Sequence, residues 1–319
     1  MDRRNFIKTT AFATLAPIHC LPACQDPASM PIIDTHQHLW DLSMLDLRWL
    51  SPPIDRSFLM DDYLEAIAGQ NVVKAIYMEV GAPPEQRKLE ADWALELCRD
   101  PENSTVAAVI AKDPRDENFG EYMGSFEGSP YIKGIRHFFQ ATAEITDQKV
   151  IDNIRLLGDM GFSFDLGLPP RWLAAGSRLV DQCPGTPFVL NHCGSADPVA
   201  FFPEGRERPR EPLHDRDLWM REIEQMARRS NVICKISGIV SRVPEYPLTA
   251  EDLSPIINHC LDRFGPDRVV FAGDWPVVLR NMSLSKWILT LKEVVASRSD
   301  EERRKLFHDN AEIFYGLSY

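Results

Sequence analysis

The residues Ile32-Ile33-Asp34-Thr35-His36-Gln37-His38-Leu39 begin as an apolar strand and end in two histidines separated by one residue. Side chains two positions apart in a strand point to the same face. His36 and His38 are therefore expected to project together from one strand end, with Asp34 below them. Two imidazoles in this arrangement can hold a metal ion, polarise a carbonyl group or transfer protons. A partly buried strand with incidental histidines is the alternative, and the rest of the chain decides between them.

Similar apolar runs recur along the chain and are separated by segments of helical periodicity. The eight predicted strands are 32–39, 72–80, 105–112, 132–139, 162–168, 187–193, 232–237 and 269–275. The predicted helices include 84–99, 147–160, 171–181, 217–229, 250–264 and 283–296. Strands that alternate with helices predict βαβ units and a parallel sheet, and eight units make a closed barrel. The sequence therefore predicts an α/β fold, a single-domain (β/α)8 TIM barrel over residues 31–319.

Composition and charge narrow the classes of partner. The chain has 319 residues, of which 44% are apolar and 26% charged, so a sizeable core is available. The formal net charge is −12, and no basic run offsets it. Such a chain is not expected to bind nucleic acid or anionic membrane surfaces. After residue 30 no apolar stretch is long enough for a membrane-spanning helix.

The first thirty residues read as a separate unit, an export leader and tether. Arg3-Arg4-Asn5-Phe6-Ile7-Lys8 precedes a mostly apolar or small-residue stretch, in a pattern that resembles a bacterial twin-arginine signal. Leu21-Pro22-Ala23-Cys24 resembles a lipoprotein cleavage box, although Pro22 departs from the usual pattern. These features predict export to the periplasm by the leader at 1–24, with a lipid anchor at Cys24 as the only membrane attachment. The alternative is a short frayed segment on a cytoplasmic protein.

The cysteines do not predict a metal cluster or a disulfide framework. Seven are present, and five remain once Cys20 and Cys24 are assigned to the leader. Five is an odd number, and none of them are spaced as C-x-x-C. Most are expected to be small, buried, apolar side chains.

Polar and ionisable side chains collect at the C-terminal ends of the predicted strands. They are His36 and His38 on the first strand, Glu79 on the second, Arg136 and His137 on the fourth, His192 on the sixth, and Asp274 on the eighth. A barrel interior is normally filled by branched apolar side chains, so ionisable groups on several strand ends favour a site over a core. On a regular strand His192 lies on the same face as Phe188 and Leu190, and Asp274 on the same face as Val270 and Ala272. Each is therefore expected to be the last side chain of an otherwise apolar row that faces the barrel interior. Arg136 is expected to point inward, with His137 as the second choice.

Six motifs also occur in the order typical of one family. They are Ile33 to Trp40, Lys133-Gly134-Ile135-Arg136-His137, Phe164-Asp165-Leu166, Val189-Leu190-Asn191-His192, Cys234 to Gly238, and Phe271 to Pro276. Together they resemble the amidohydrolase-2 family of the amidohydrolase superfamily, in particular its sugar-acid lactonase branch with L-fuconolactonase and L-rhamnonolactonase. The resemblance covers residues 31–319. It implies a (β/α)8 barrel that hydrolyses a cyclic ester, a reaction of carbohydrate metabolism.

Lactone hydrolysis requires a base that deprotonates water, a group that polarises the carbonyl, and hydrogen-bond donors that stabilise the tetrahedral oxyanion. Asp274 is the expected base, and His192 with His36 or His38 is expected to orient the carbonyl and stabilise its charge. The planar guanidinium of Arg136 is expected to bind a carboxylate or hydroxyl groups of the substrate. His137 and Glu79 are further candidates for substrate binding. The aromatic residues expected to stack on a ring or an apolar face are Trp40, Trp275 and Tyr77.

One divalent metal ion, most naturally zinc, is an optional cofactor in this interpretation. His36, His38 and Asp274 with water could form a catalytic site. In metal-dependent branches of the superfamily a strand-five histidine completes the set, and residues 162–168 contain none. The related dicarboxylate lactonases work without metal. The segment after His192 also departs from the H-x-G-K-P pattern of many such lactonases, which leaves the substrate open.

Two other functions remain open at this stage. Within the fold, the chain could be a decarboxylase or hydratase of an unsaturated carboxylic acid, although such relatives use the full metal set. It could also be a non-catalytic, exported barrel that binds a sugar acid, a role that does not need Asp274. The long loop at 194–213 is expected on the site face, as a lid, a substrate rim or a solvated excursion. Aromatics in the loop 41–59 could form a pocket wall.

Overall fold

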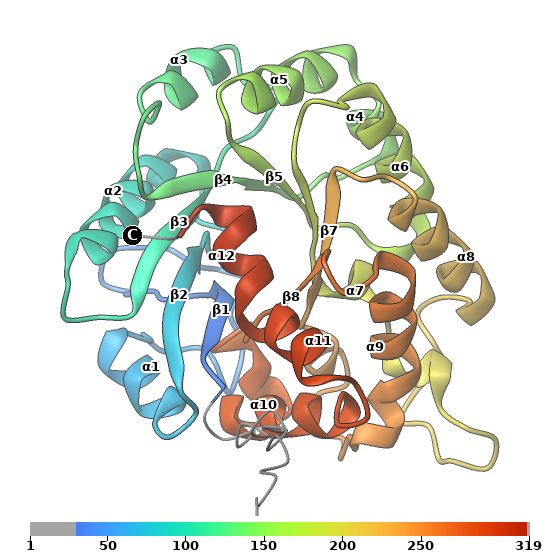
Figure 1. The fold of residues 1–319 in the computed structure, drawn as a ribbon. Coiled ribbons are helices and arrows are strands. Elements are labelled where there is room, and N and C mark those ends of the chain that lie inside the picture. The colour runs from blue at the N-terminus through green and yellow to red at the C-terminus, as the bar shows by residue number, and fades with distance from the viewer. Residues whose placement is uncertain (1–29, 318–319) are drawn as a thin grey trace, which may run out of the picture.

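The computed structural model describes residues 30–317, which form a barrel of eight parallel strands enclosed by helices (Figure 1). The strands are β1 (Ile32–Gln37), β2 (Val72–Met78), β3 (Thr105–Ala111), β4 (Ile132–His137), β5 (Ser163–Leu166), β6 (Phe188–Leu190), β7 (Val232–Ile236) and β8 (Val269–Phe271). Neighbours in the sheet follow chain order, and every pair is parallel. This is the predicted (β/α)8 TIM barrel.

The barrel closes between β1 and the segment that follows β8. The backbone N–H of Asp274 donates to the carbonyl of His36 at 2.9 Å, and that of His38 donates to the carbonyl of Trp275 at 2.7 Å. The hydroxyl of Thr35 also donates to the carbonyl of Phe271 at 2.7 Å. The closing contacts therefore bring His36, His38 and Asp274 side by side at one end of the barrel.

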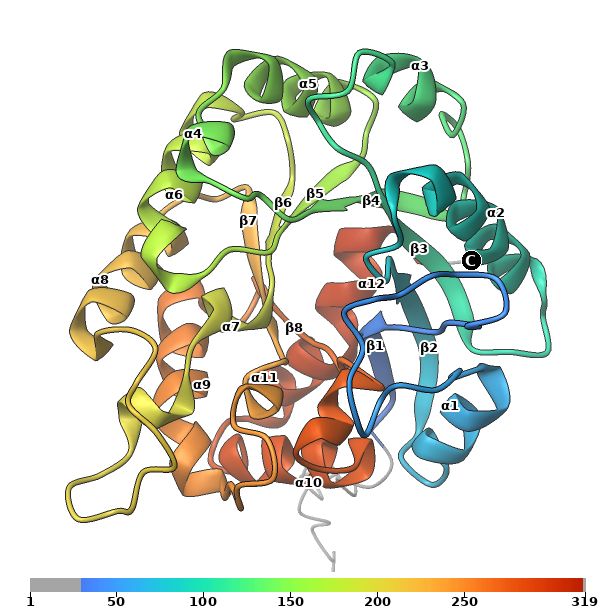
Figure 2. The same ribbon diagram turned by 180° about the vertical axis from the view of Figure 1, so that it is seen from behind.

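Helices cover the outside of the barrel (Figures 1 and 2). They are α1 (Met60–Ile67), α2 (Arg87–Arg99), α3 (Phe119–Gly124), α4 (Thr142–Ile145), α5 (Gln148–Asp159), α6 (Leu173–Gln182), α7 (His192–Ser195), α8 (Arg216–Ala227), α9 (Ala250–Phe264), α10 (Leu284–Val294), α11 (Asp300–Arg304) and α12 (Asn310–Tyr315). Shorter helical turns are η1 (Pro84–Gln86), η2 (Pro170–Trp172), η3 (Pro198–Phe201), η4 (Val240–Arg242), η5 (Val277–Arg280) and η6 (Lys305–Asp309). Several helices begin at a side chain that caps their free N–H groups, such as Asp147, Asp215 and Thr249.

Strand side chains alternate between the barrel interior and the layer beneath the helices. On β6, Val189 belongs to the interior core, whereas Phe188 and Leu190 belong to the outer core. Tyr315 and Leu317 of the C-terminal segment join the interior core. Figure 1 shows that α12 lies across one end of the barrel. A site that opens to solvent is therefore expected at the opposite end.

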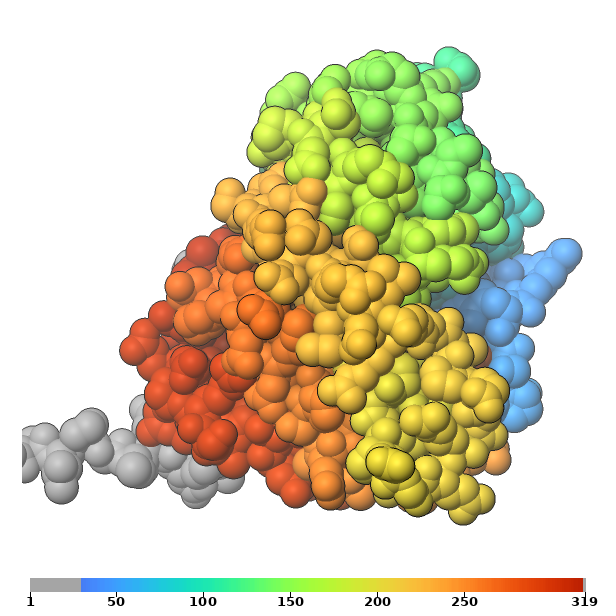
Figure 3. Space-filling model, turned by 90° about the vertical axis from the view of Figure 1, so that its right-hand side faces the viewer, coloured from blue at the N-terminus to red at the C-terminus, as the bar shows by residue number. Residues whose placement is uncertain are grey.

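The two long loops at 41–59 and 194–213 are both ordered by specific contacts. Trp40 and Phe58 form an isolated antiparallel bridge that closes the first loop at its base. In the second, Arg210 donates to both carboxylate oxygens of the fully buried Asp197, at 2.6 and 2.9 Å. Figure 3 shows this second loop in yellow as part of the continuous surface beside α8 and α9.

The structure corrects the predicted extent of several elements. Strand six was predicted to run to residue 193 and strand eight to residue 275, but β6 ends at Leu190 and β8 at Phe271. The short helices α3, α4, α11 and α12 were not predicted. Among residues 30–317, no helix combines the length and the hydropathy needed to cross a bilayer. The predicted leader and its lipid anchor at Cys24 lie outside the described residues.

Candidate active site

A cavity of about 480 Å³ opens at the C-terminal end of the strands. Its lining comes from the end of β4 and from the segments that follow six of the strands: His38, Trp49, Val80, Gly81, Arg136, Phe138, His192, Leu213, Gly238, Ser241, Arg242, Asp274, Val277 and Arg280. The C-terminal face is where TIM barrels carry their sites. Four of the predicted site residues, His38, Arg136, His192 and Asp274, therefore line one cavity.

Asp274 lies at the centre of three imidazoles. Its Oδ1 atom is 3.7 Å from Nε2 of His36, 3.7 Å from Nε2 of His38 and 3.9 Å from Nε2 of His192. The side chain of Asp274 is 5% exposed, so it reaches the cavity through a narrow opening. Its backbone has a positive φ of 54°, which is unusual for a residue other than glycine. The carboxylate points inward, on the side that strand parity predicted, since Val270 of the same row belongs to the interior core.

Two of the imidazoles are fixed through their second ring nitrogen. Nδ1 of His38 lies 2.9 Å from the carbonyl oxygen of Met78, which can only accept, so Nδ1 carries the proton. Its Nε2 then faces Asp274. Nδ1 of His192 lies 2.9 Å from the hydroxyl of Ser237, which leaves its Nε2 toward the cavity. Partners of this kind hold the orientation of a catalytic or metal-binding histidine.

His192 reaches the cavity from a left-handed turn. The parity argument placed His192 on the same strand face as Phe188 and Leu190, but those two side chains face the helix layer. After Asn191 the backbone instead adopts a positive φ at four consecutive residues, His192, Cys193, Gly194 and Ser195. This turn, α7, redirects the imidazole into the cavity. The residue was identified correctly as a lining residue, but the strand geometry used to place it was wrong.

Arg136 forms one face of the site and links two other predicted residues. Its Nε atom forms an ion pair with Glu79, and its Nη2 donates to the carbonyl oxygen of Glu79 at 2.5 Å. Its Nη1 lies 3.1 Å from Nε2 of His36. Because a guanidinium can only donate, Nε2 of His36 accepts this hydrogen bond. Glu79 is therefore a support for Arg136 and does not line the main cavity.

The charge states of these groups suit acid–base chemistry. Burial lowers the pKa of His36 well below its ordinary value, and nearby Lys235 adds to the effect. Burial likewise lowers the pKa of His192 to about 3. Burial alone would raise the pKa of Asp274, but interactions with His192, His38 and Arg136 outweigh it and lower that pKa. At neutral pH the site therefore holds the carboxylate of Asp274 beside the neutral imidazoles of His36 and His192 and the guanidinium of Arg136.

The three aromatics expected to stack on a ring do not line the cavity. Trp40, Tyr77 and Trp275 are at most 1% exposed and belong to the packed core. The hydroxyl of Tyr77 donates to Glu90, which shows that the ring points away from the cavity. Trp49 and Phe138 take the expected role instead, with 40% and 47% exposure at the cavity rim. Trp49 comes from the 41–59 loop, where a pocket wall was expected.

His137, the second choice on strand four, points elsewhere. Its Nε2 atom lies 3.8 Å from Oδ1 of Asp113, and the ring lines a separate polar cavity of about 370 Å³.

Asp34 also lies outside the main cavity. Its carboxylate accepts hydrogen bonds from the backbone of Gly273 at 2.7 Å and from the hydroxyl of Tyr63 at 3.0 Å. Asp34 thus ties β1 to the end of β8 and to α1.

Sequence reasoning missed two arginines of the cavity, Arg242 and Arg280. They lie in η4 and η5, the turns that follow β7 and β8, so only their position a few residues after a predicted strand could have identified them. With Arg136 they give the cavity lining three arginines. Leu213, from the end of the 194–213 loop, completes the rim and gives that loop a role in lining the cavity.

The donor set fits one divalent metal ion. Nε2 of His36, Nε2 of His192 and a carboxylate oxygen of Asp274 lie within 4.8 Å of one another, and His38 approaches the same oxygen. Neutral imidazoles and a carboxylate are the ligand forms that zinc takes. His192 thus joins the set His36, His38 and Asp274 predicted from sequence. The guanidinium of Arg136 competes with an ion for Nε2 of His36.

Known proteins share this fold and sequence pattern. A family model described as amidohydrolase matches residues 33–317. An L-fucono-1,5-lactonase of Burkholderia multivorans is 27% identical over 300 residues, which cover 89% of this chain and 96% of that protein. An L-rhamnono-gamma-lactonase of Scheffersomyces stipitis is 24% identical over 205 residues, covering 58% and 59%. A crystal structure of a Burkholderia multivorans amidohydrolase with bound zinc has a TM-score of 0.77 at 25% identity, covering 90% and 100%.

Proposed function

Because this chain belongs to the amidohydrolase family, we propose that it hydrolyses the lactone of a sugar acid or of a similar small carboxylic acid. The observation that carries the proposal is the carboxylate of Asp274 among the Nε2 atoms of three histidines, at 3.7, 3.7 and 3.9 Å. The lactonase names of two relatives support the same class of substrate.

Asp274 acts as the general base in this mechanism. Its carboxylate takes a proton from a water molecule while the water oxygen forms a bond to the lactone carbonyl carbon. Nε2 of His38, which faces Asp274, accepts the second hydrogen of that water and orients it. When the ester C–O bond breaks, the ring oxygen leaves as an alkoxide and takes up the proton held by Asp274. The product is the open-chain hydroxy acid.

His192 and Arg136 stabilise the charge that develops on the carbonyl oxygen. Nε2 of His192 donates once its Nδ1 accepts from Ser237, and the cationic Arg136 lies beside the same space. Because the side chains of Arg136 and His192 are only 5% and 17% exposed, these donors act more strongly than they would in solvent. Arg136 is held rigidly by Glu79, so little reorganisation accompanies the reaction.

The cavity lining supports a small, polar substrate with an apolar face. Arg242 and Arg280 offer hydrogen-bond donors to hydroxyl or carboxylate groups. Trp49 and Phe138 at the rim offer flat surfaces for a sugar ring. A volume of about 480 Å³ matches a molecule of this size.

A metal ion is optional in this proposal. His36, His38, His192 and Asp274 would hold it, and a bound zinc ion would polarise the carbonyl and acidify water. Metal analysis of the purified protein and assay after complete removal by a chelator test this. Full activity of the stripped protein would exclude a metal requirement, whereas activity restored by zinc would establish one.

The decisive experiment compares wild type with Asp274→Asn on a panel of aldonic and dicarboxylic lactones, with acid release followed by a pH indicator. We expect turnover to fall at least about a hundredfold, the scale for loss of a general base. Asp55→Asn, an exposed aspartate outside the cavity lining, is the control and should match wild type. Unchanged hydrolysis by Asp274→Asn would refute the role of Asp274. Release of carbon dioxide from carboxylic acid substrates, without lactone hydrolysis, would instead indicate a decarboxylase.

We further propose that the leader at 1–24 directs export to the periplasm, on the strength of Arg3-Arg4 and the apolar stretch that follows. Replacing both arginines by lysine should retain the protein in the cytoplasm, as measured by cell fractionation. Unimpaired export of this variant would exclude a twin-arginine route. Labelling with radioactive fatty acid, with Cys24→Ser as the control, tests the lipid anchor.

A further inference from the structure

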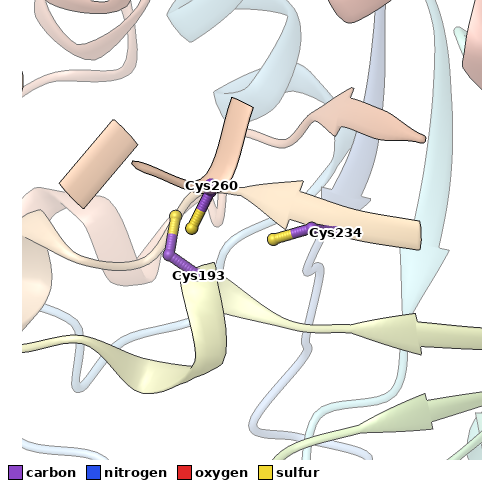
Figure 4. A group of neighbouring side chains, drawn as sticks. All are labelled: Cys193, Cys234 and Cys260. Carbon is purple, nitrogen blue, oxygen red and sulfur yellow. The ribbon is translucent and has the colours of Figure 1, made fainter. Parts of the chain in front are cut away.

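Three cysteines from distant parts of the chain meet in the layer between the barrel and its helices. Cys193 lies in α7, Cys234 on β7 and Cys260 on α9, and Figure 4 shows their side chains turned toward one another. All three are fully buried. Their sulfur atoms lie within 4.8 Å of one another. The sequence did not predict this group, because none of the three share a local spacing.

The spacing of the sulfurs suits a single metal ion. Bonds between a thiolate and a metal such as zinc measure about 2.3 Å, so three thiolates around one ion in a plane lie about 4.0 Å apart. The sulfurs of Cys193, Cys234 and Cys260 need only small side-chain rotations to meet this geometry. Among residues 30–317, no histidine or carboxylate joins the group. A three-coordinate, all-sulfur site selects a soft ion over the harder ions that bind oxygen.

The backbone around the three thiols is held in place, and their other polar contacts are weak. The indole N–H of Trp219 donates to the carbonyl of Cys193 at 3.1 Å. The thiols of Cys193 and Cys234 each reach the carbonyl of Lys235 only at the long distances of 3.8 and 3.9 Å. Binding an ion would therefore replace weak S–H contacts and leave the strand and helix positions unchanged.

We propose that Cys193, Cys234 and Cys260 form a binding site for a soft, thiophilic metal ion such as Cu(I) or Cd(II). Each thiol that coordinates releases its proton to water, and no electron is transferred. The site is distinct from the cavity group of His36, His192 and Asp274, whose nitrogen and oxygen donors prefer a different ion. It shares only the α7 turn with that group, through the adjacent residues His192 and Cys193.

Titration of the full chain with Cd2+ tests the proposal, because cadmium bound to thiolates gives an ultraviolet charge-transfer band that nitrogen and oxygen ligands do not produce. All proteins carry Cys20→Ser and Cys24→Ser, so that only the five cysteines of the described residues contribute. The metal is added both to the folded protein and during refolding, because the site is closed to solvent.

We expect one equivalent of Cd2+ to produce the band and to raise the melting temperature. Cys98→Ala is the matched control, since it removes a buried cysteine outside the group and should leave the band unchanged. Cys234→Ala and Cys260→Ala, on different elements, should each abolish it, with folding checked by circular dichroism. Absence of the band in the folded parent protein with Cys20→Ser and Cys24→Ser, or its persistence in both variants, would overturn the proposal. Asp274→Asn should retain the band, which separates this result from the proposed hydrolase function.

Discussion

Replacing Gly238 by alanine tests whether the position of His192 controls turnover. Gly238 follows β7 with a positive φ of 63°, and a Cβ atom there would lie 2.2 Å from Nδ1 of His192 and 2.4 Å from its Cγ. Ordinary contact begins at 3.4 Å, and the difference between 3.4 and 2.2 Å means a shift of the ring by at least 1.2 Å. That shift breaks the contact of His192 with Ser237 and moves Nε2 away from Asp274.

The expected loss of activity is large. Displacing a catalytic group by about 1 Å lowers turnover by about a hundredfold. Alanine at a left-handed position also costs about 1–2 kcal/mol of folding stability, whatever its neighbours. Activity is measured as kcat/KM for lactone hydrolysis, and stability by thermal unfolding.

Gly69→Ala separates these two effects. Gly69 has a φ of 75°, and a Cβ atom added there would meet no atom within 4 Å, so the variant carries the backbone penalty without the clash. It should lose similar stability and keep full activity. If Gly238→Ala also retained wild-type kcat/KM, the assignment of His192 to the reaction would be refuted.

Three further predictions concern buried groups. Because the pKa of Asp274 lies below its ordinary 3.8, protonation of this base should lower kcat/KM only below about pH 4; protonation of Asp274 itself near pH 6 would contradict the assigned base. The ammonium of Lys235 lies 2.8 Å from the carboxylate of Asp165, and both side chains are fully buried. Lys235→Met should lower the free energy of unfolding, measured in urea, by about 3–5 kcal/mol, because it leaves that carboxylate buried without its cationic partner. Adding Asp165→Leu should restore much of the loss, and equal stability of wild type and the single variant would argue against a charged pair. Trp219→Phe should lower kcat more than it raises KM, because it removes the hydrogen bond that holds the α7 turn, and an unchanged kcat would show that this bond does not position His192.

The fold was largely predictable because its signals are repetitive. Eight apolar runs alternate with helical segments, and each βαβ unit independently indicates a parallel sheet that closes into a barrel. The ends of the strands were not predictable to this accuracy. The predicted strands six and eight ran on to residues 193 and 275, but the regular strands end at Leu190 and Phe271, where the chain enters the turns that carry His192 and Asp274.

The candidate site was predictable in composition but not in geometry. Arg136 and Asp274 are ionisable groups at strand ends, which a core would exclude, and both line the cavity. The rule of strand parity failed at His192, where the backbone adopts a positive φ, but it placed Asp274 correctly on the side of Val270, which belongs to the interior core. Trp40 was predicted at the cavity because aromatics near a site resemble a stacking surface. Its complete burial depends on the path of the loop at 41–59, which no local pattern specifies.

The left-handed α7 turn also affects how this protein could be made more heat-resistant. His192, Cys193 and Ser195 each hold a conformation that disfavours L-amino acids by about 1–2 kcal/mol, so the turn lowers the stability of the fold by a few kcal/mol. Ser195→Gly is expected to raise the stability of the fold, because glycine adopts this backbone conformation without strain. Ser195 does not line the cavity, so the substitution removes no cavity contact. The same relief would loosen the turn that carries His192. Thermostability and catalytic precision are therefore expected to compete at this one segment.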